Sequence, residues 1–296
     1  MEARHLFVKG VDGNGIFYRL EDFLVYFTIT GVIVREMGLT VLAFCPMFNH
    51  VHFLLDSASL AVCRQFIQRI ALFFVKEYND EYRRTGALFK RHFGSSLKKG
   101  VKIIMGCIAY IFNNPVAGKL FGKAWEYKWN LLAYYRNDHP FSKKVRRKGC
   151  RAPMRRALLK VDYAWSKGQY LSYGMLKSIL EELNQEEIRQ ITDYIISKYN
   201  FLSYKSLEIL YGSYEKLCLA VEANAGSEYE LTDEYGDHSC YRKMLQVVQS
   251  LGYKGRDLNF ERLNQDELDN LIRHNIMNVK APSSSIRKFL HIRGGG

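Results

Sequence analysis

Two histidines separated by a single residue, His50 and His52, are the side chains in this sequence best placed for chemistry. The residues around them, Val51-His-Phe-Leu-Leu55, indicate a β-strand, in which residues i and i+2 point to the same face about 6.5–7 Å apart. Both imidazoles could then bind one divalent ion while the apolar residues face the core. Two histidines at this spacing also occur by chance in many strands, so the pair alone does not establish a metal site.

A tyrosine and an asparagine form a second group. The segment Ile108-Ala-Tyr-Ile-Phe-Asn-Asn-Pro-Val116 places Tyr110 and Asn114 at i and i+4, on one face of a helix. A phenol is a poor nucleophile at its usual pKa of about 10, but a nearby cation that polarises the attacked phosphate makes it useful. The chain has 20 tyrosines, so packing in the core is the alternative role for Tyr110.

The elements that must position these side chains follow the order strand, helix, strand, strand, helix, strand, helix. We expect strands at 5–9, 40–45, 51–55 and 89–97, and helices at 21–37, 59–82 and 101–113. Gly38 is a stop signal for the first helix, and Asn114-Pro115 should end the third, because the residue before proline is pushed out of the helical region. An antiparallel sheet with helices on one face accounts for this order.

Several of these segments resemble one protein family. Phe48-Asn-His-Val-His-Phe-Leu-Leu55 resembles the histidine–hydrophobic–histidine strand of HUH nucleases, and Tyr110-Ile-Phe-Asn-Asn-Pro-Val116 resembles the tyrosine helix of their single-tyrosine transposase branch. The resemblance runs from about His5 to Tyr135 and is closest to the REP-associated tyrosine transposases. It also includes His5-Leu-Phe-Val-Lys-Gly10, Ile16-Phe17, Gly86-Ala-Leu-Phe-Lys90, and Trp125-Glu-Tyr-Lys-Trp129 with Tyr134.

The resemblance implies a ferredoxin-like (RRM-like) α+β fold and a metal-dependent endonuclease and transposase of single-stranded, hairpin DNA. It implies His50, His52 and Asn114 as ligands of Mg²⁺ or Mn²⁺, and Tyr110 as the nucleophile. Attack by Tyr110 would give a 5′-phosphotyrosine and a free 3′-OH, and the conserved bond energy would let a 3′-OH rejoin the strand. The family includes monomers and homodimers, so both remain open here.

Three positions depart from the family pattern. Phe48 stands where the family usually has proline, Lys9 replaces the common arginine before Gly10, and His92 sits near a position usually held by arginine. None of these changes removes a predicted ligand or the nucleophile. They concern the preference for a particular DNA end more than the chemistry.

The charge of the chain favours a polyanionic partner, because 43 Lys+Arg against 30 Asp+Glu give a formal net charge of +13. One group of candidate DNA contacts lies close to the predicted site in sequence: Lys90, Arg91, Lys98, Lys99 and Lys102. A solvated charged face is the alternative for this group. A second group belongs to a basic stretch with few acids, which indicates an arm that contacts DNA: Arg146, Arg147, Arg155 and Arg156.

This basic stretch also suggests the domain division. We expect a catalytic domain at 1–135, a basic linker at 136–160 and a mainly helical domain at 161–296. Candidate helix starts in the last domain are Asn184, Asn264 and Ser283, and the helices near 265–274 and 283–292 are similar to a helix-turn-helix. The isolated histidines of this region are predicted to be surface or capping residues: His238, His274 and His291.

Compartment follows from what the sequence lacks. No apolar run approaches the roughly 20 residues of a membrane span, and the N-terminus lacks the layout of a secretory signal. The six cysteines are scattered without a C-x-x-C pair, which indicates thiols in a reducing compartment. We therefore expect a cytoplasmic, nucleoid-associated protein without a membrane partner.

Three other functions remain open on this sequence. The first is a catalytically silent DNA-binding or regulatory protein on the same fold. The second is an unrelated metal phosphohydrolase that uses His50 and His52 with water, rather than Tyr110, as its nucleophile. The third is a helical adaptor built on the C-terminal half, which would be indifferent to DNA.

Overall fold

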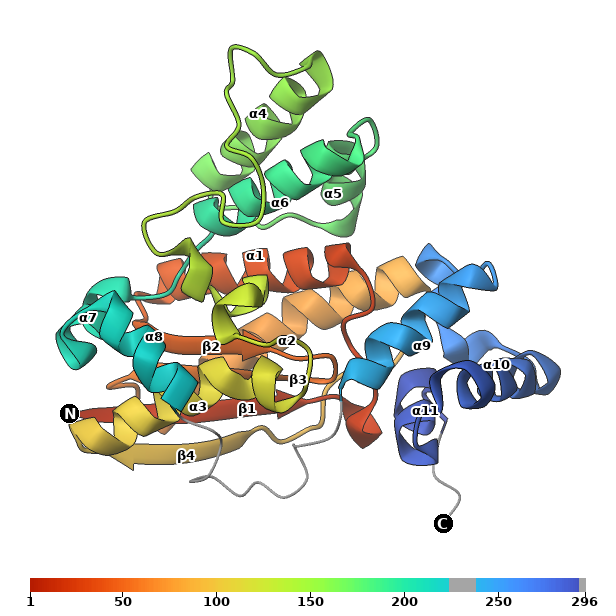
Figure 1. The fold of residues 1–296 in the computed structure, drawn as a ribbon, viewed down its shortest axis with the longest axis horizontal. Coiled ribbons are helices and arrows are strands. Elements are labelled where there is room, and N and C mark those ends of the chain that lie inside the picture. Colours follow the sequence, from red (N-terminus) through yellow and green to blue (C-terminus); the bar gives the residue numbers. More distant parts are fainter. Residues whose placement is uncertain (224–237, 293–296) are drawn as a thin grey trace.

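The structure is a computed structural model that describes residues 1–223 and 238–292. Its N-terminal part is a four-stranded antiparallel sheet in the order β2-β3-β1-β4 (Figure 1). The strands are β1 (Glu2–Lys9), β2 (Val41–Pro46), β3 (His50–Asp56) and β4 (Gly94–Lys99). The helices α1 (Leu20–Met37), α2 (Leu60–Tyr82) and α3 (Val101–Ala117) follow β1, β3 and β4. The predicted α+β class and its ferredoxin-like strand order are confirmed.

The two faces of this sheet carry different helices. Phe53 of β3 packs against Phe66 of α2, with ring centroids 5.1 Å apart, and Phe27 of α1 lies against the neighbouring strand β2. His52 points to the other face, where its ring lies 5.9 Å from that of Tyr110 in α3. The expected covering of one face holds for α1 and α2, whereas α3 lies on the opposite face, together with the histidines.

The limits of most elements follow from local sequence signals. Gly38 ends α1 in the left-handed conformation at φ 61°, as predicted, and Ser59 caps α2 by accepting a hydrogen bond from the Val62 N–H at 3.3 Å. The predicted start of the fourth strand at residue 89 is wrong. Phe89 makes an isolated bridge to Gly10, and β4 begins at Gly94, where a Cβ would lie 1.8 Å from Phe7 Cζ.

The predicted end of α3 at Asn114-Pro115 is also wrong, because the helix continues to Ala117. Pro115 cannot donate the hydrogen bond that the Ile111 carbonyl would accept in a regular helix. The side chain of Asn114 replaces it in part, since its Nδ2 donates to Ile111 O at 3.4 Å and to Tyr110 O at 3.0 Å. A proline is therefore tolerated in the last turn of the helix.

The rest of the described chain is helical, as predicted. The helices are α4 (Ala152–Ser166), α5 (Tyr173–Leu180), α6 (Gln185–Lys198), α7 (Tyr204–Tyr211), α8 (Tyr214–Ala223), α9 (Ser239–Ser250), α10 (Gln265–Val279) and α11 (Ser283–Leu290). The three predicted starts are observed: Asn184 and Asn264 form capping boxes, and α11 begins at Ser283. In Figure 1, α4–α6 lie over α1, α7 and α8 lie beside α3, and α9–α11 form a cluster at one end of the sheet.

These helices complete the packing of the sheet. Leu202 forms a parallel bridge with Val41, and the Ser203 N–H donates to the Val41 carbonyl at 2.9 Å, so this segment lies along β2 at the edge of the sheet. At the β2–β3 turn, the ring of Phe48 stacks on Tyr241 of α9 at 4.2 Å and lies 5.8 Å from Phe289 of α11. The departure at position 48 therefore provides an aromatic contact between the histidine strand and the C-terminal helices.

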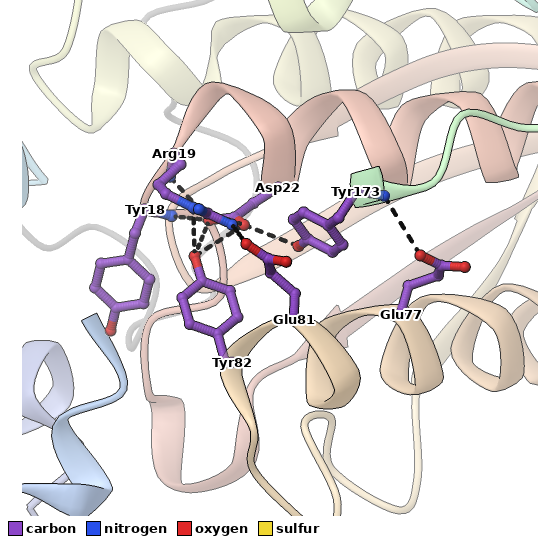
Figure 2. Close-up of polar contacts among 7 residues, drawn as sticks. All are labelled: Tyr18, Arg19, Asp22, Glu77, Glu81, Tyr82 and Tyr173. Atoms are coloured by element: carbon purple, nitrogen blue, oxygen red, sulfur yellow. Dashed lines mark hydrogen bonds and ion pairs between the residues drawn. The ribbon is translucent and has the colours of Figure 1, made fainter. Parts of the chain in front are cut away.

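A buried carboxylate joins α1, α2 and α5 (Figure 2). Asp22 is fully buried and accepts hydrogen bonds from the backbone N–H groups of Tyr18 and Arg19, at 2.9 and 2.8 Å. It also accepts from the hydroxyls of Tyr82 in α2 and Tyr173 in α5, at 2.9 and 2.8 Å. Burial raises the pKa of this carboxyl, and Arg19 opposes the rise. The helical region is thus attached to the sheet domain through a shared polar centre.

Across residues 1–223 and 238–292, no helix combines the length and the apolar character that crossing a membrane requires.

Candidate functional site

Strand register places three histidines on the face of the sheet that α3 covers. In β3, His50 and His52 alternate with the core residues Val51 and Phe53, and their ring centroids are 4.9 Å apart. The antiparallel pairing with β1 places Phe7 opposite His52 and Leu54 opposite His5, so His5 belongs to the same face. Its Nε2 lies 3.0 Å from Nδ1 of His52.

The protonation of His50 can be worked out from its neighbour. Asn49 donates from Nδ2 to the Gly13 carbonyl at 2.8 Å, which leaves Oδ1 as the atom 2.8 Å from His50 Nδ1. An amide oxygen can only accept, so Nδ1 of His50 carries the proton and Nε2 has the lone pair. Nε2 is buried and has no hydrogen-bond partner among the described residues. A ring nitrogen in this state suits a metal ligand, whose other nitrogen usually donates to an oxygen.

Tyr110 lies beside two of these histidines. Its ring meets those of His52 and His5 edge-on, with centroids 5.9 and 6.1 Å apart. Asn114, one turn further along α3, is buried, and its Nδ2 is engaged by the helix backbone, so Oδ1 is the atom left to act as a ligand. The next turn ends at Gly118, whose carbonyl accepts a hydrogen bond from the His238 N–H at 3.1 Å.

Two histidines of this cluster were not predicted as site residues. His238 was expected at the surface or as a cap; it does occupy the N-cap position of α9, but it is 5% exposed and its ring lies 5.8 Å from His50. Nothing in the local sequence indicates this, because the contact depends on how α9 docks. For His5 the sequence does contain an indication, because His5 alternates with core residues along β1 and so must lie on the other face of the strand. Its place beside His52, however, depends on the register between β1 and β3.

His5, His50 and His52 are neutral at physiological pH because the folded chain buries them. Burial lowers the pKa of His5 to about 3, and the nearby Lys98 adds to the effect. Burial also lowers the pKa values of His50 and His52 well below their usual range, with contributions from His238 on His50 and from His50 on His52. Neutral imidazoles retain the lone pairs that a metal ion requires.

We expect the free energy of unfolding to fall as the pH drops below about 6.5, the usual pKa of histidine. In that range the unfolded chain protonates His5, His50 and His52, whereas the folded chain keeps them neutral, down to about pH 3 for His5. Below pH 6.5, each histidine therefore lowers the free energy of unfolding by about 1.4 kcal/mol for each unit that the pH falls. Above pH 6.5 the histidines are neutral in both states, and the full stability is present.

Urea unfolding at pH 7.5, 6.5 and 5.5 measures this slope. The variant His5→Gln should lower it by about one third, because one of three equivalent protonations is removed. Equal stability at pH 7.5 and 5.5 would contradict the neutral, buried cluster.

Most of the first group of predicted DNA contacts lies on or near this face. The Lys90 N–H donates to the Lys9 carbonyl at 2.9 Å, and Lys9 is the residue opposite His50, so Lys90 and Arg91 are near that end of the site. Lys98 lies in β4 close enough to His5 to affect its pKa. Of the other two members, Lys102 is exposed in the first turn of α3. Lys99 is opposite Glu2 in the β1–β4 register and so belongs to the other face of the sheet, where it pairs with Glu2 at 3.1 Å.

The second group lies elsewhere. Residues Arg146, Arg147, Arg155 and Arg156 belong to the α4–α6 region, which packs on α1 and so lies across the sheet from the histidines. Acids later in the chain oppose several cations of the stretch: Arg147 pairs with Asp162, Arg151 with Glu187 and Arg156 with Glu182. Helix α4 also spans residue 160, the predicted end of the basic linker.

The side chains around the histidines limit which metal ion could bind there and through which ligands. Within the described ranges, no group of three or more His, Cys, Asp or Glu side chains is arranged to bind a metal ion. A site here would therefore depend on two imidazoles and a different third ligand, such as the amide of Asn114. The buried Nε2 of His50, which has no hydrogen-bond partner among the described residues, could bind a cation directly. A mixed set of nitrogen and oxygen ligands fits a divalent cation such as Mn²⁺.

Comparison with known proteins gives little beyond this geometry. No protein-family model matches the sequence, and no curated protein matches it. A solved structure of a REP-associated tyrosine transposase bound to a REP hairpin is similar over 46% of this chain and 78% of that chain, with 12% identity and a TM-score of 0.35.

Proposed function

We propose that this chain is a metal-dependent nuclease-transposase that cuts and rejoins single-stranded hairpin DNA through a covalent bond to Tyr110. The proposed metal ligands are His50, His52 and Asn114, with Mg²⁺ or Mn²⁺ as the ion. The choice of DNA follows from the sequence resemblance and from the net charge of +13. The protein would act in the cytoplasm with the nucleoid, as a monomer or a homodimer.

The observation that carries the proposal is the meeting of three rings on one face of the sheet. Tyr110 comes from α3 and His52 from β3, yet their rings are 5.9 Å apart, and His50 lies 4.9 Å from His52. A tyrosine that only filled the core would not need two neutral imidazoles beside it, because buried polar groups are costly unless they are satisfied.

The chemistry assigns a task to each side chain. The Tyr110 oxygen would attack the phosphorus and lose its proton, and the bond to the 3′ oxygen would break, leaving a 5′-phosphotyrosine and a 3′-OH after proton uptake. A divalent ion bound at the site would polarise a non-bridging phosphate oxygen. Asn49 would keep the proton of His50 on Nδ1, and the cations near residues 90 and 98 would bind flanking phosphates.

A second candidate is a catalytically silent DNA-binding protein on the same fold. The observation in its favour is burial: Tyr110 is 4% exposed, and His50 and His52 are 3% and 0% exposed. The enzyme proposal therefore requires that DNA binding opens this face so that a phosphate reaches the Tyr110 oxygen.

The two candidates predict different products on single-stranded hairpin DNA. We expect the full chain, given a labelled hairpin oligonucleotide and Mn²⁺, to form a covalent adduct that survives denaturing electrophoresis. The released strand should carry a 3′-OH that a template-independent polymerase can extend, and a chelator should prevent both products. DNA binding without an adduct at any tested Mg²⁺ or Mn²⁺ concentration would reject the enzyme and favour the silent protein. Turnover of a small phosphodiester without an adduct would instead favour a metal phosphohydrolase.

A further inference from the structure

His5 is in contact with both parts of the proposed site. Its Nε2 lies 3.0 Å from Nδ1 of His52, and the two rings are stacked with centroids 5.2 Å apart and an interplanar angle of 26°. The same ring meets Tyr110 edge-on at 6.1 Å. His5 is 4% exposed, so the burial of this polar group has to be explained by its contacts.

The hydrogen bond between His5 and His52 contains one proton, and its position decides which atom of His52 can bind a metal. A neutral imidazole has one N–H and one lone pair. If His52 Nδ1 carries the proton and donates it to His5 Nε2, then His52 Nε2 has the lone pair. If His5 donates instead, His52 Nε2 is protonated and is lost as a ligand.

The neighbouring histidine shows the arrangement that this face favours. His50 donates from Nδ1 to Asn49 Oδ1, which leaves its Nε2 as the lone-pair nitrogen. Two adjacent ligands that both use Nε2 require an acceptor at each Nδ1. Asn49 supplies one of these acceptors, and His5, from a different strand, is in the position to supply the other.

We propose that His5 is a positioning residue of the metal site, which accepts the Nδ1 proton of His52 and thereby presents His52 Nε2 as a ligand. His5 itself does not bind the ion. This inference depends on the proposed function, because it assumes that His52 is a ligand. Partners of this kind typically change metal affinity about 10- to 100-fold when they are removed.

The test compares two substitutions of His5 by direct metal binding, without DNA. In His5→Gln the amide reaches about as far as the imidazole and can accept a hydrogen bond, whereas His5→Leu is apolar. The full chain is titrated with Mn²⁺, and the free ion is followed by electron paramagnetic resonance. We expect His5→Gln to bind about as tightly as the wild type and His5→Leu to bind about 10- to 100-fold more weakly. Leu6→Val, next to His5 on the same strand but on the core side of the sheet opposite Phe53, is the matched control and should bind normally.

Equal Mn²⁺ affinity in His5→Leu and the wild type would overturn the role of His5. A second measurement uses the unmodified chain, so it does not depend on how the variants fold. Nitrogen-15 NMR of the histidine rings should show His52 protonated on Nδ1, and protonation on Nε2 would overturn the inference. A wild type that binds no Mn²⁺ would reject the metal site as a whole. Normal Mn²⁺ binding with the expected effect of His5→Leu, but no covalent adduct, would reject only the nuclease.

Discussion

Replacing Tyr110 with phenylalanine should abolish the covalent adduct between the protein and single-stranded DNA while DNA binding survives. The substitution removes only the hydroxyl, so the ring keeps its contacts with His5 and His52. Loss of a nucleophile removes the covalent route altogether, and we expect the cleavage rate to fall by at least about 10³-fold. Denaturing electrophoresis measures the adduct, and fluorescence anisotropy of the labelled hairpin measures binding.

A matched control separates the role of this hydroxyl from a general effect on packing. Tyr26 in α1 is also buried, on the other side of the sheet, and burial raises its pKa. Tyr26→Phe should therefore leave adduct formation unchanged. Cleavage at the wild-type rate by Tyr110→Phe would remove Tyr110 from its proposed role and would leave the histidines to be explained by another chemistry.

The largest effect on stability should come from Asp22→Ala. The substitution leaves two backbone N–H groups and the hydroxyls of Tyr82 and Tyr173 without their acceptor in a buried site (Figure 2). It also leaves Arg19 without the charge 3.8 Å from its Nε. Breaking a buried charged network in this way costs about 3–5 kcal/mol. Urea unfolding at pH 7.5 measures the loss, and a change below about 1 kcal/mol would show that water replaces the carboxylate without cost.

Tyr173→Phe tests the part of this network that belongs to the helical region. It removes one hydrogen bond to a charged group, which is worth about 1.5–3 kcal/mol. In a double-mutant cycle the two changes should not add, because Asp22→Ala already breaks the same bond. Additive losses would show that Tyr173 and Asp22 stabilise the chain independently.

Much of the sheet domain could be predicted from the sequence, because its signals are local. The alternation around His50 and His52 and the stop at Gly38 depend only on neighbouring residues. The prediction for α3 failed at Pro115 because a side chain, Asn114, took the place of the missing backbone donor. The rule that the residue before proline leaves the helical region considers only the backbone, so it does not predict a side chain that replaces the missing donor.

The candidate site was predicted less completely, because it depends on register and docking. His5 meets His52 only through the pairing of β1 with β3, and His238 reaches His50 from a helix almost 190 residues later in the sequence. The same applies to the basic stretch, where Asp162, Glu182 and Glu187 oppose cations that precede them in the chain. Whether His50, His52 and Asn114 bind an ion, and whether Tyr110 attacks DNA, remain predictions.

The segment along β2 has a consequence for any attempt to isolate the first 135 residues. Such a fragment would lose Leu202 and Ser203, and the backbone of Val41 would become an open edge that invites pairing with another copy. Phe48 would lose its stacking partners Tyr241 and Phe289 and would face water. The part of the chain with the histidines and the tyrosine is therefore expected to aggregate when expressed alone, because two of its surfaces are covered by residues that come later in the chain.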